Sequence, residues 1–270
     1  MSKFKSTYTL NDEESAYLVY KWISQSKEYD YDGEKQGNST TEIAKVYKKG
    51  KGGVIGITGL YKTMCDRLKI KADTILGLTK TFSDDYPRKI IIKQYTWNYI
   101  LIDNEYYLID VVMGLNFDKD FSYNKRYFDF YFGMDPEASI RLHFPNDNKW
   151  QLLPKIISKD EFKSMAYLDE GFYSIGLKII SPDIQSLNST KDIKIRLTSD
   201  KSFDEIFDQL DFQETKEVKG EMLEFGFFEI NEISNRVYEF NYHLYGGFSD
   251  IYVENKKTRE IFYLIFFDSI

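Results

Sequence analysis

Apolar residues in the first part of the chain recur at helical spacing. The clearest stripe starts at Ile57 and places apolar side chains at i, i+3, i+4, i+7 and i+11, which predicts a buried helix from about Val54 to Leu68. An earlier helix is expected over about residues 12–24, where one apolar face follows Asn11 and Glu14 at the spacing of a capping box. A further helix is expected from Ser39.

The period then changes from helical to strand-like. The segments Thr74–Lys80, Ile90–Ile102 and Glu105–Val112 are rich in Ile, Tyr and Leu, and Asp103-Asn104 between the last two is typical of a tight hairpin turn. Asp135-Pro136-Glu137 has the order of an N-cap, a first-position proline and a first-turn acid, so a short helix is expected there.

Short strand patterns separated by turns fill the C-terminal part of the chain. The candidates are Phe172–Ile180, Asp192–Leu197, Leu223–Ile230, Arg236–Tyr245, Ser249–Glu254 and Glu260–Phe267. This spacing favours a β-sandwich of immunoglobulin type. The sequence therefore predicts an α+β fold, with one domain at residues 1–155, a linker at 156–171 and an all-β sandwich domain at 172–270.

Composition narrows the class of function. A net charge of -7 argues against a nucleic-acid partner, which needs a basic surface to neutralise phosphates. The single Cys65 excludes an intramolecular disulfide, and with only His143 and His243 beside it no metal site and no cofactor are predicted.

The chain contains no apolar run near the ~20 residues of a membrane span. Met1–Lys5 lacks the apolar region of a signal peptide, so a cytoplasmic protein is expected. A secreted protein whose leader was removed is the alternative.

Four sequence blocks, in order, resemble the transglutaminase-like superfamily. They are Gly52-Gly53-Val54-Ile55-Gly56-Ile57-Thr58-Gly59-Leu60, Gln94-Tyr95-Thr96-Trp97-Asn98, Tyr106-Tyr107-Leu108-Ile109-Asp110, and the stretch from Tyr131 to Leu153. The last block, with Phe144-Pro145 and Trp150-Gln151-Leu152-Leu153, is similar to the kyphoscoliosis-peptidase-like branch. The likeness covers about Leu10 to Ile180 and implies a papain-like transglutaminase core.

The resemblance also implies where a catalytic triad would lie. Its cysteine would stand at the start of the buried helix, its histidine on a strand and its aspartate at the end of the next strand. These positions hold Val54, Tyr95 and Asp110, so the catalytic Cys and His are replaced. Because Val54 cannot ionise or attack, the chain is expected to be a pseudoenzyme and not an enzyme.

The same positions suggest a binding cleft. Trp97, Tyr95 and Asp110 are its tentative binding residues, and a hydrogen bond from the Tyr95 hydroxyl to Asp110 is expected to replace the lost His–Asp pair. With no imidazole to orient, Asp110 itself is expected to be solvated or to cap a turn. Cys65 is expected to be a buried packing residue, and His143 to have a capping or packing role.

A protein-binding scaffold or adaptor is therefore the leading hypothesis, with a protein or peptide as the partner. Two alternatives stay open. One is a cysteine-protease or transglutaminase-type enzyme with a displaced nucleophile, and the other is a regulatory partner of an active paralogue. The sequence does not fix the oligomeric state.

Overall fold

The computed structural model describes residues 10–82, 90–115, 128–168, 170–174, 176–181, 192–207, 210–218, 221–227, 229–243, 249–255 and 261–267. The chain forms two compact units. The first contains residues 1–79, 93–139 and 143–156, and the second contains 80–92, 140–142 and 157–270. The chain thus passes from one unit to the other more than once.

The helices of the first unit are α2 (Asp12–Ser26), α3 (Tyr31–Lys35), α4 (Ile43–Lys49), α5 (Val54–Arg67) and the start of α6 (Pro136–Leu142), with single 3-10 turns η1 (Met113–Leu115), η2 (Phe128–Tyr131) and η3 (Asn148–Gln151). Helices α2 and α6 begin where the sequence places their caps, whereas α3 was not expected and α4 begins at Ile43, after the N-cap Glu42, and not at Ser39 as expected. The predicted capping box of Asn11 and Glu14 is present in α2, and Asp135 caps α6.

A five-stranded sheet, most of whose residues belong to the first unit, has the order β6-β5-β4-β3-β7; its pairs β3–β7, β4–β5 and β5–β6 are antiparallel. Its strands are β3 (Lys71–Phe82), β4 (Ile90–Ile102), β5 (Glu105–Ile109), β6 (Phe132–Met134) and β7 (His143–Pro145). The predicted turn between β4 and β5 is present, and Asp103 and Asn104 both take positive φ angles of 50° and 67°. A separate parallel pair joins β1 (Glu28–Tyr29) to β2 (Lys51–Gly52).

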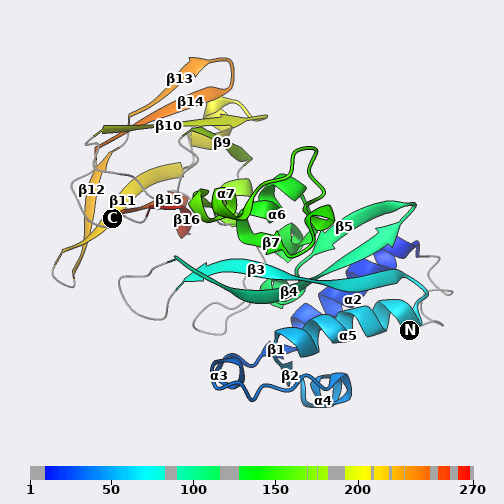
Figure 1. The fold of residues 1–270 in the computed structure, drawn as a ribbon. Coiled ribbons are helices and arrows are strands. Elements are labelled where there is room, and N and C mark those ends of the chain that lie inside the picture. Colours follow the sequence, from blue (N-terminus) through cyan, green and yellow to red (C-terminus); the bar gives the residue numbers. More distant parts are fainter. Residues whose placement is uncertain are drawn as a thin grey trace. The chain divides into compact units, whose positions relative to one another are not determined.

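Helices α2 and α5 lie side by side and pack their apolar stripes into the core (Figure 1). Tyr20 and Ile23 of α2 and Ile57 and Tyr61 of α5 are fully buried. The Asn98 side chain of β4 donates from Nδ2 to the carbonyl of Thr58 on α5, at 3.1 Å. This bond fixes the helix against the strand that holds Tyr95 and Trp97.

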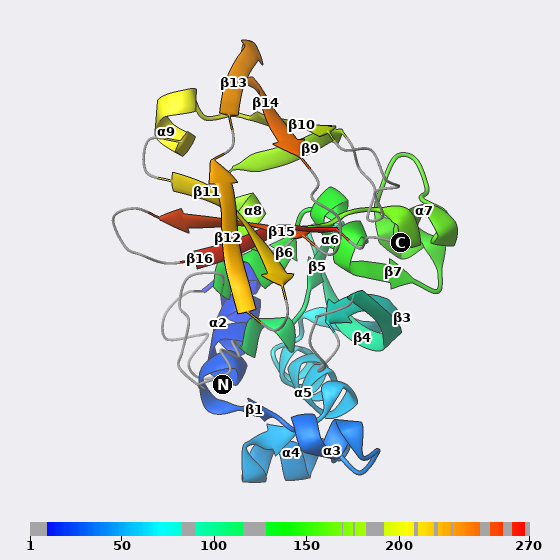
Figure 2. The same cartoon turned by 90° about the vertical axis from the view of Figure 1, so that its left-hand side faces the viewer.

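Two antiparallel sheets make up most of the second unit (Figure 2). One has the order β13-β14-β10-β9 and the other β12-β11-β15-β16-β8. The strands are β8 (Tyr167–Leu168), β9 (Leu177–Ser181), β10 (Asp192–Ser199), β11 (Leu210–Val218), β12 (Glu221–Phe227), β13 (Glu229–Ser234), β14 (Val237–His243), β15 (Ser249–Asn255) and β16 (Ile261–Phe267). The helices are α7 (Lys159–Ser164), α8 (Glu170–Ser174) and α9 (Phe203–Phe207).

Several expectations for this unit need correction. The stretch 156–171, expected as a linker, contains α7 and β8, and β8 is the edge strand that pairs with β16. Helix α8 occupies the start of the expected strand 172–180, and the expected strand 223–230 is divided between β12 and β13.

The structure confirms a mixed α+β architecture, whereas the immunoglobulin type of the second domain stays a prediction. In the described part of the chain, no helix is both long and apolar enough to cross a membrane.

Candidate functional site

Asp110 lies directly after β5 and its carboxylate is fully buried. Oδ1 accepts hydrogen bonds from the Tyr95 hydroxyl at 3.0 Å and from the backbone N–H groups of Val112 at 3.0 Å and Met113 at 2.8 Å. The expected Tyr95–Asp110 bond is therefore present. The expectation that Asp110 is solvated is wrong, because the carboxylate combines a turn-capping role with complete burial.

An imidazole also contacts Asp110, which the sequence did not indicate. His143 Nε2 lies 2.8 Å from Asp110 Oδ2, and both side chains are fully buried. His143 reaches this position because β7 pairs with β3, in a register that sets it opposite Thr79. Its sequence distance from Asp110 and the shortness of β7 left no local pattern from which the pairing could be found.

His143 packs between two aromatic rings of β4. Its ring lies 5.6 Å from that of Tyr95, nearly parallel to it, and 4.9 Å from that of Trp97. The backbone N–H of His143 also caps α6 by donating to Ser139. The expected capping and packing roles of His143 are thus both present, in addition to the contact with Asp110.

Gly77 of β3 makes room for this arrangement. A Cβ atom at this position would come 2.2 Å from the carbonyl oxygen of Phe144 and 2.8 Å from the Trp97 ring. Any larger residue would push apart β3, β7 and the indole. The close approach of β7 and of the Trp97 ring to β3 therefore depends on a glycine at position 77.

The three tentative binding residues are all buried. Tyr95, Trp97 and Asp110 expose at most a few percent of their surface, so in this structure they form an internal cluster. Trp97 Nε1 and His143 Nδ1 have no hydrogen-bond partner among the described residues. If His143 donates from Nε2 to the carboxylate, its Nδ1 is left as an acceptor or a second donor according to the charge of the ring.

Burial and the Asp110 carboxylate dominate the electrostatics of Tyr95. Burial first, then the charge of Asp110 and its hydrogen bond, raise the pKa of Tyr95 well above the usual value of a phenol. Tyr29 and Glu34 add to this rise in pKa, so both lie within electrostatic reach of Tyr95. The phenol remains a protonated hydrogen-bond donor across the physiological range.

Val54 is the first residue of α5, and its neighbour is a carboxylate that the sequence did not single out. The backbone N–H of Val54 donates to Glu34 Oε1 at 3.2 Å, and the Ser39 hydroxyl donates to the same oxygen at 2.5 Å. The charge of Glu34 is also a minor cause of the raised pKa of Tyr95. Glu34 follows no recognisable motif, so no sequence signal pointed to it.

The remaining candidates for nucleophilic chemistry are occupied or desolvated. Cys65 is buried inside α5, as expected, and burial raises the pKa of its thiol to about 12. The Thr58 hydroxyl donates to the carbonyl of Val54 at 2.8 Å within the same helix. Among the described residues, no group of three or more His, Cys, Asp or Glu side chains is arranged to hold a metal ion.

The chain is similar in sequence to several known proteins. No protein-family model matches the chain. Mouse kyphoscoliosis peptidase is 26% identical over 195 residues, which cover 68% of this chain and 29% of the mouse protein. The Lim and transglutaminase domain protein ltd-1 of Caenorhabditis elegans is 24% identical over 191 residues, covering 65% of this chain and 26% of that protein.

A third relative is cytokinesis protein 3 of Schizosaccharomyces pombe, which is 26% identical over 167 residues, covering 59% of this chain and 18% of its own length. A solved TGase structure superimposes with a TM-score of 0.32 at 11% identity, over 45% of this chain and 31% of that one. The chain spans less than a third of the length of each of these curated relatives. It is a distant homologue of kyphoscoliosis peptidase and of transglutaminase-like proteins.

Proposed function

We propose that the protein is a catalytically inactive transglutaminase-like protein that binds a protein or peptide segment as a scaffold or adaptor. The observation that carries this proposal is the enclosure of Asp110. Its carboxylate is buried and paired with Tyr95, His143 and two backbone N–H groups. The only thiol of the chain lies elsewhere, inside α5.

The resemblance in sequence supports the loss of chemistry. It assigns the nucleophile position to Val54 and the base position to Tyr95. An aliphatic side chain cannot attack a carbonyl, and a phenol with a strongly raised pKa is a poor base near neutral pH. Both changes leave a scaffold that can still hold an extended segment but cannot form an acyl intermediate.

One observation favours the alternative of an enzyme with a displaced nucleophile. The Asp110–His143 contact, at 2.8 Å, is the orienter-and-base half of a hydrolytic triad. Against this, both side chains are fully buried, and Tyr95 and Trp97 cover the imidazole. A base that no substrate can reach stabilises the fold rather than a transition state, so the binding role is the stronger proposal.

Activity assays with the unmodified protein test the catalytic half of the proposal. Amine incorporation into a glutamine-containing protein and hydrolysis of a peptide mixture should both stay at the rate without protein. Activity above that rate would overturn the proposal, and Cys65→Ser would then show whether the activity comes from the buried thiol or from another group.

Binding is tested at the surface beside Val54. Ile55 is 59% exposed at the start of α5, and Ile233 is 47% exposed on β13. A random-peptide library selected on the immobilised protein supplies ligands, whose affinity is then measured by calorimetry. Ile55→Glu should weaken binding at least tenfold and Ile233→Glu should not, because only the first introduces a charge next to the proposed site. Equal effects of the two variants would place the binding surface elsewhere.

Two further assignments belong to the same proposal. The two antiparallel sheets of the second unit fit an immunoglobulin-type sandwich, whose strand edges can accept an extended segment. A cytoplasmic location fits a chain with one cysteine and hence no internal disulfide.

A further inference from the structure

Helix α5 starts without a side-chain cap of its own. Its N-cap residue is Gly53, which offers no side chain to the first N–H groups of the helix. Helix N-termini attract negative charge, because their unpaired N–H groups and the helix dipole point the same way. With 14 residues, α5 is long enough for this effect to be appreciable.

A carboxylate from an earlier part of the chain occupies this position. Glu34, 20 residues before Val54, accepts the hydrogen bond from the Val54 N–H, and Ser39 holds the same oxygen from the other side. A Cβ atom at Gly53 would come 1.7 Å from Glu34 Oε1 and 2.3 Å from Ser39 Oγ. Gly53 therefore permits the approach of a carboxylate that any other residue would block.

We propose that Glu34 is an internal latch, a carboxylate that fills the anion position at the start of α5 and keeps this helix end closed to any other anionic group. The inference rests on the proposed function, since it names a second, separate reason why position 54 supports no thiolate. Replacing Val54 by cysteine alone would supply a thiol, but not the electrostatic environment that lowers the pKa of a thiol.

The groups around the latch are mainly acidic or phenolic. The charge of Glu34 adds to the raised pKa of Tyr29 and, as a smaller cause, to that of Tyr95, Asp30 likewise raises the pKa of Tyr29, and Lys51 is paired with Asp30 at 3.1 Å. An unpaired cation that would cancel the charge of Glu34 is not among these groups. An added thiol at the start of α5 would thus meet a negative field despite the helix dipole.

A pair of variants tests this directly. Val54→Cys places a thiol at the first position of α5, and Val54→Cys with Glu34→Gln places the same thiol there without the carboxylate. The thiol pKa is read from the ultraviolet absorbance of the thiolate as pH rises, which does not require access for a reagent. The native Cys65 stays silent in this range because burial raises its pKa to about 12.

The double variant should have a thiol pKa at least about one unit below that of Val54→Cys alone, a tenfold change in the thiolate equilibrium. The matched control is Glu42→Gln in the Val54→Cys background. Glu42 is exposed and paired with Lys45, so its loss should leave the thiol pKa unchanged. Equal thiol pKa values with and without Glu34 would overturn the latch.

A second measurement needs no cysteine. In NMR spectra the backbone amide proton of Val54 should differ in chemical shift between the unmodified protein and Glu34→Gln, because a neutral amide replaces the carboxylate that accepts its hydrogen bond. The same chemical shift in both proteins would also overturn the proposal. Catalytic activity in the unmodified protein would instead refute the proposed function, and leaves both readouts unaffected.

Discussion

Asp110 holds together the interior of the candidate site, because strands β4 and β7 and the turn after β5 each contribute a hydrogen-bond donor to its carboxylate. A buried carboxylate is costly unless it is fully paired, so each of these donors offsets part of its desolvation. Removing one donor leaves the others in place, and the cost of the change reports the strength of that single bond.

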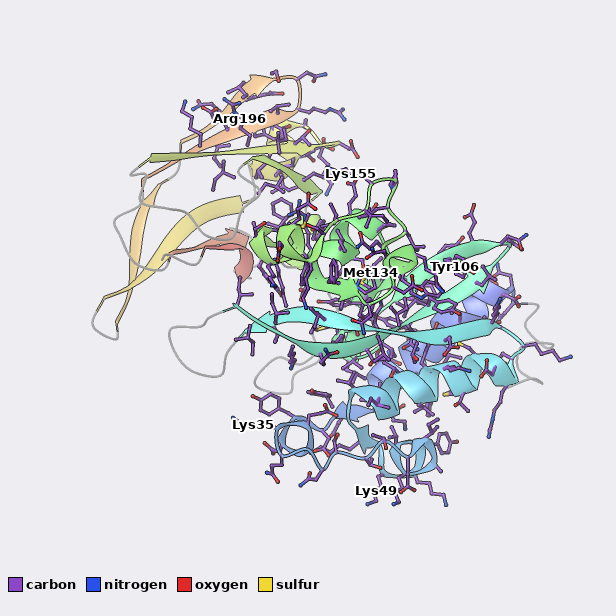
Figure 3. All side chains as sticks on the ribbon, in the orientation of Figure 1. Lys35, Lys49, Tyr106, Met134, Lys155 and Arg196 are labelled. Atoms are coloured by element: carbon purple, nitrogen blue, oxygen red, sulfur yellow. The ribbon has the colours of Figure 1, made fainter. Side chains whose placement is uncertain are left out.

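Tyr95→Phe removes the hydroxyl and keeps the ring against His143. We expect the free energy of unfolding to fall by about 1.5–3 kcal/mol, the scale of a hydrogen bond to a charged group. The measurement is denaturant unfolding at neutral pH. Tyr106→Phe is the matched control, since Tyr106 is 43% exposed on β5 and should change stability by less than about 0.5 kcal/mol (Figure 3). A similar cost for both would mean that the Tyr95 bond contributes nothing specific.

Cys65 makes the protein sensitive to alkaline pH. Its folded pKa is raised from 9.0 to about 12, so between these values the folded chain holds a proton that the unfolded chain has lost. The contribution of Cys65 to stability is therefore complete below pH 9 and is lost as pH rises toward 12, by about 1.4 kcal/mol per pH unit at most. The buried tyrosines, whose pKa values are also raised, act in the same direction.

Melting temperature measured from pH 7 to 10.5 tests this point. The unmodified protein should lose stability above pH 9, and Cys65→Ala should lose less over the same interval, although it is less stable at pH 7. Identical slopes for the two proteins would show that Cys65 does not contribute.

At the level of elements, the β3–β7 pairing determines whether His143 reaches Asp110. Gly77→Ala would force a Cβ against the Phe144 carbonyl and the Trp97 ring. We expect it to cost ~1–3 kcal/mol or more through overpacking and to move the His143 ring signals in NMR spectra. Gly59→Ala on α5 is the control, because its added Cβ meets only the Ile43 side chain at 3.3 Å and raises helix propensity. An unchanged His143 signal in Gly77→Ala would contradict this role of the glycine.

The helices with their own caps and the hairpin at Asp103-Asn104 were predictable, because their signals are local. Helix α2 has its capping box and α5 its apolar stripe, and both are present close to the predicted bounds. Helix α3 was missed because its residues have turn chemistry, and β11 because its alternation is masked by charged residues. The contacts of Asp110 with His143 and of Val54 with Glu34 join distant segments, and no local pattern encodes such contacts.

At the scale of the whole molecule, the two units are not consecutive stretches of the chain joined by a single linker. Residues 80–92 and 140–142 belong to the second unit although the flanking residues belong to the first. Lys80 illustrates this, since its buried ammonium donates to the Met165 carbonyl at 2.6 Å and lies 4.9 Å from the centre of the Phe162 ring.

Lys80, Ile140 and Leu142 are buried and belong to the second unit, most of which a fragment of residues 1–156 would lack. We expect this fragment to unfold at a lower temperature and less cooperatively than the whole chain, as followed by circular dichroism. The control is the whole chain cleaved in place and left unseparated, which should keep more of its stability. A fragment that melts as cooperatively as the whole chain would show that residues 1–156 form an independent domain.

The single cysteine also allows local opening of the structure to be measured by thiol labelling. Cys65 is the single thiol of the chain and is buried within α5, so a reagent reaches it only when the structure around it opens. When closing is faster than labelling, the observed rate is the rate for an unfolded thiol multiplied by the fraction of open molecules. Each tenfold slowing then corresponds to about 1.4 kcal/mol of opening free energy. The time course of one labelling reaction thus measures the fraction of molecules in which the surroundings of Cys65 are open, with no probe added to the chain.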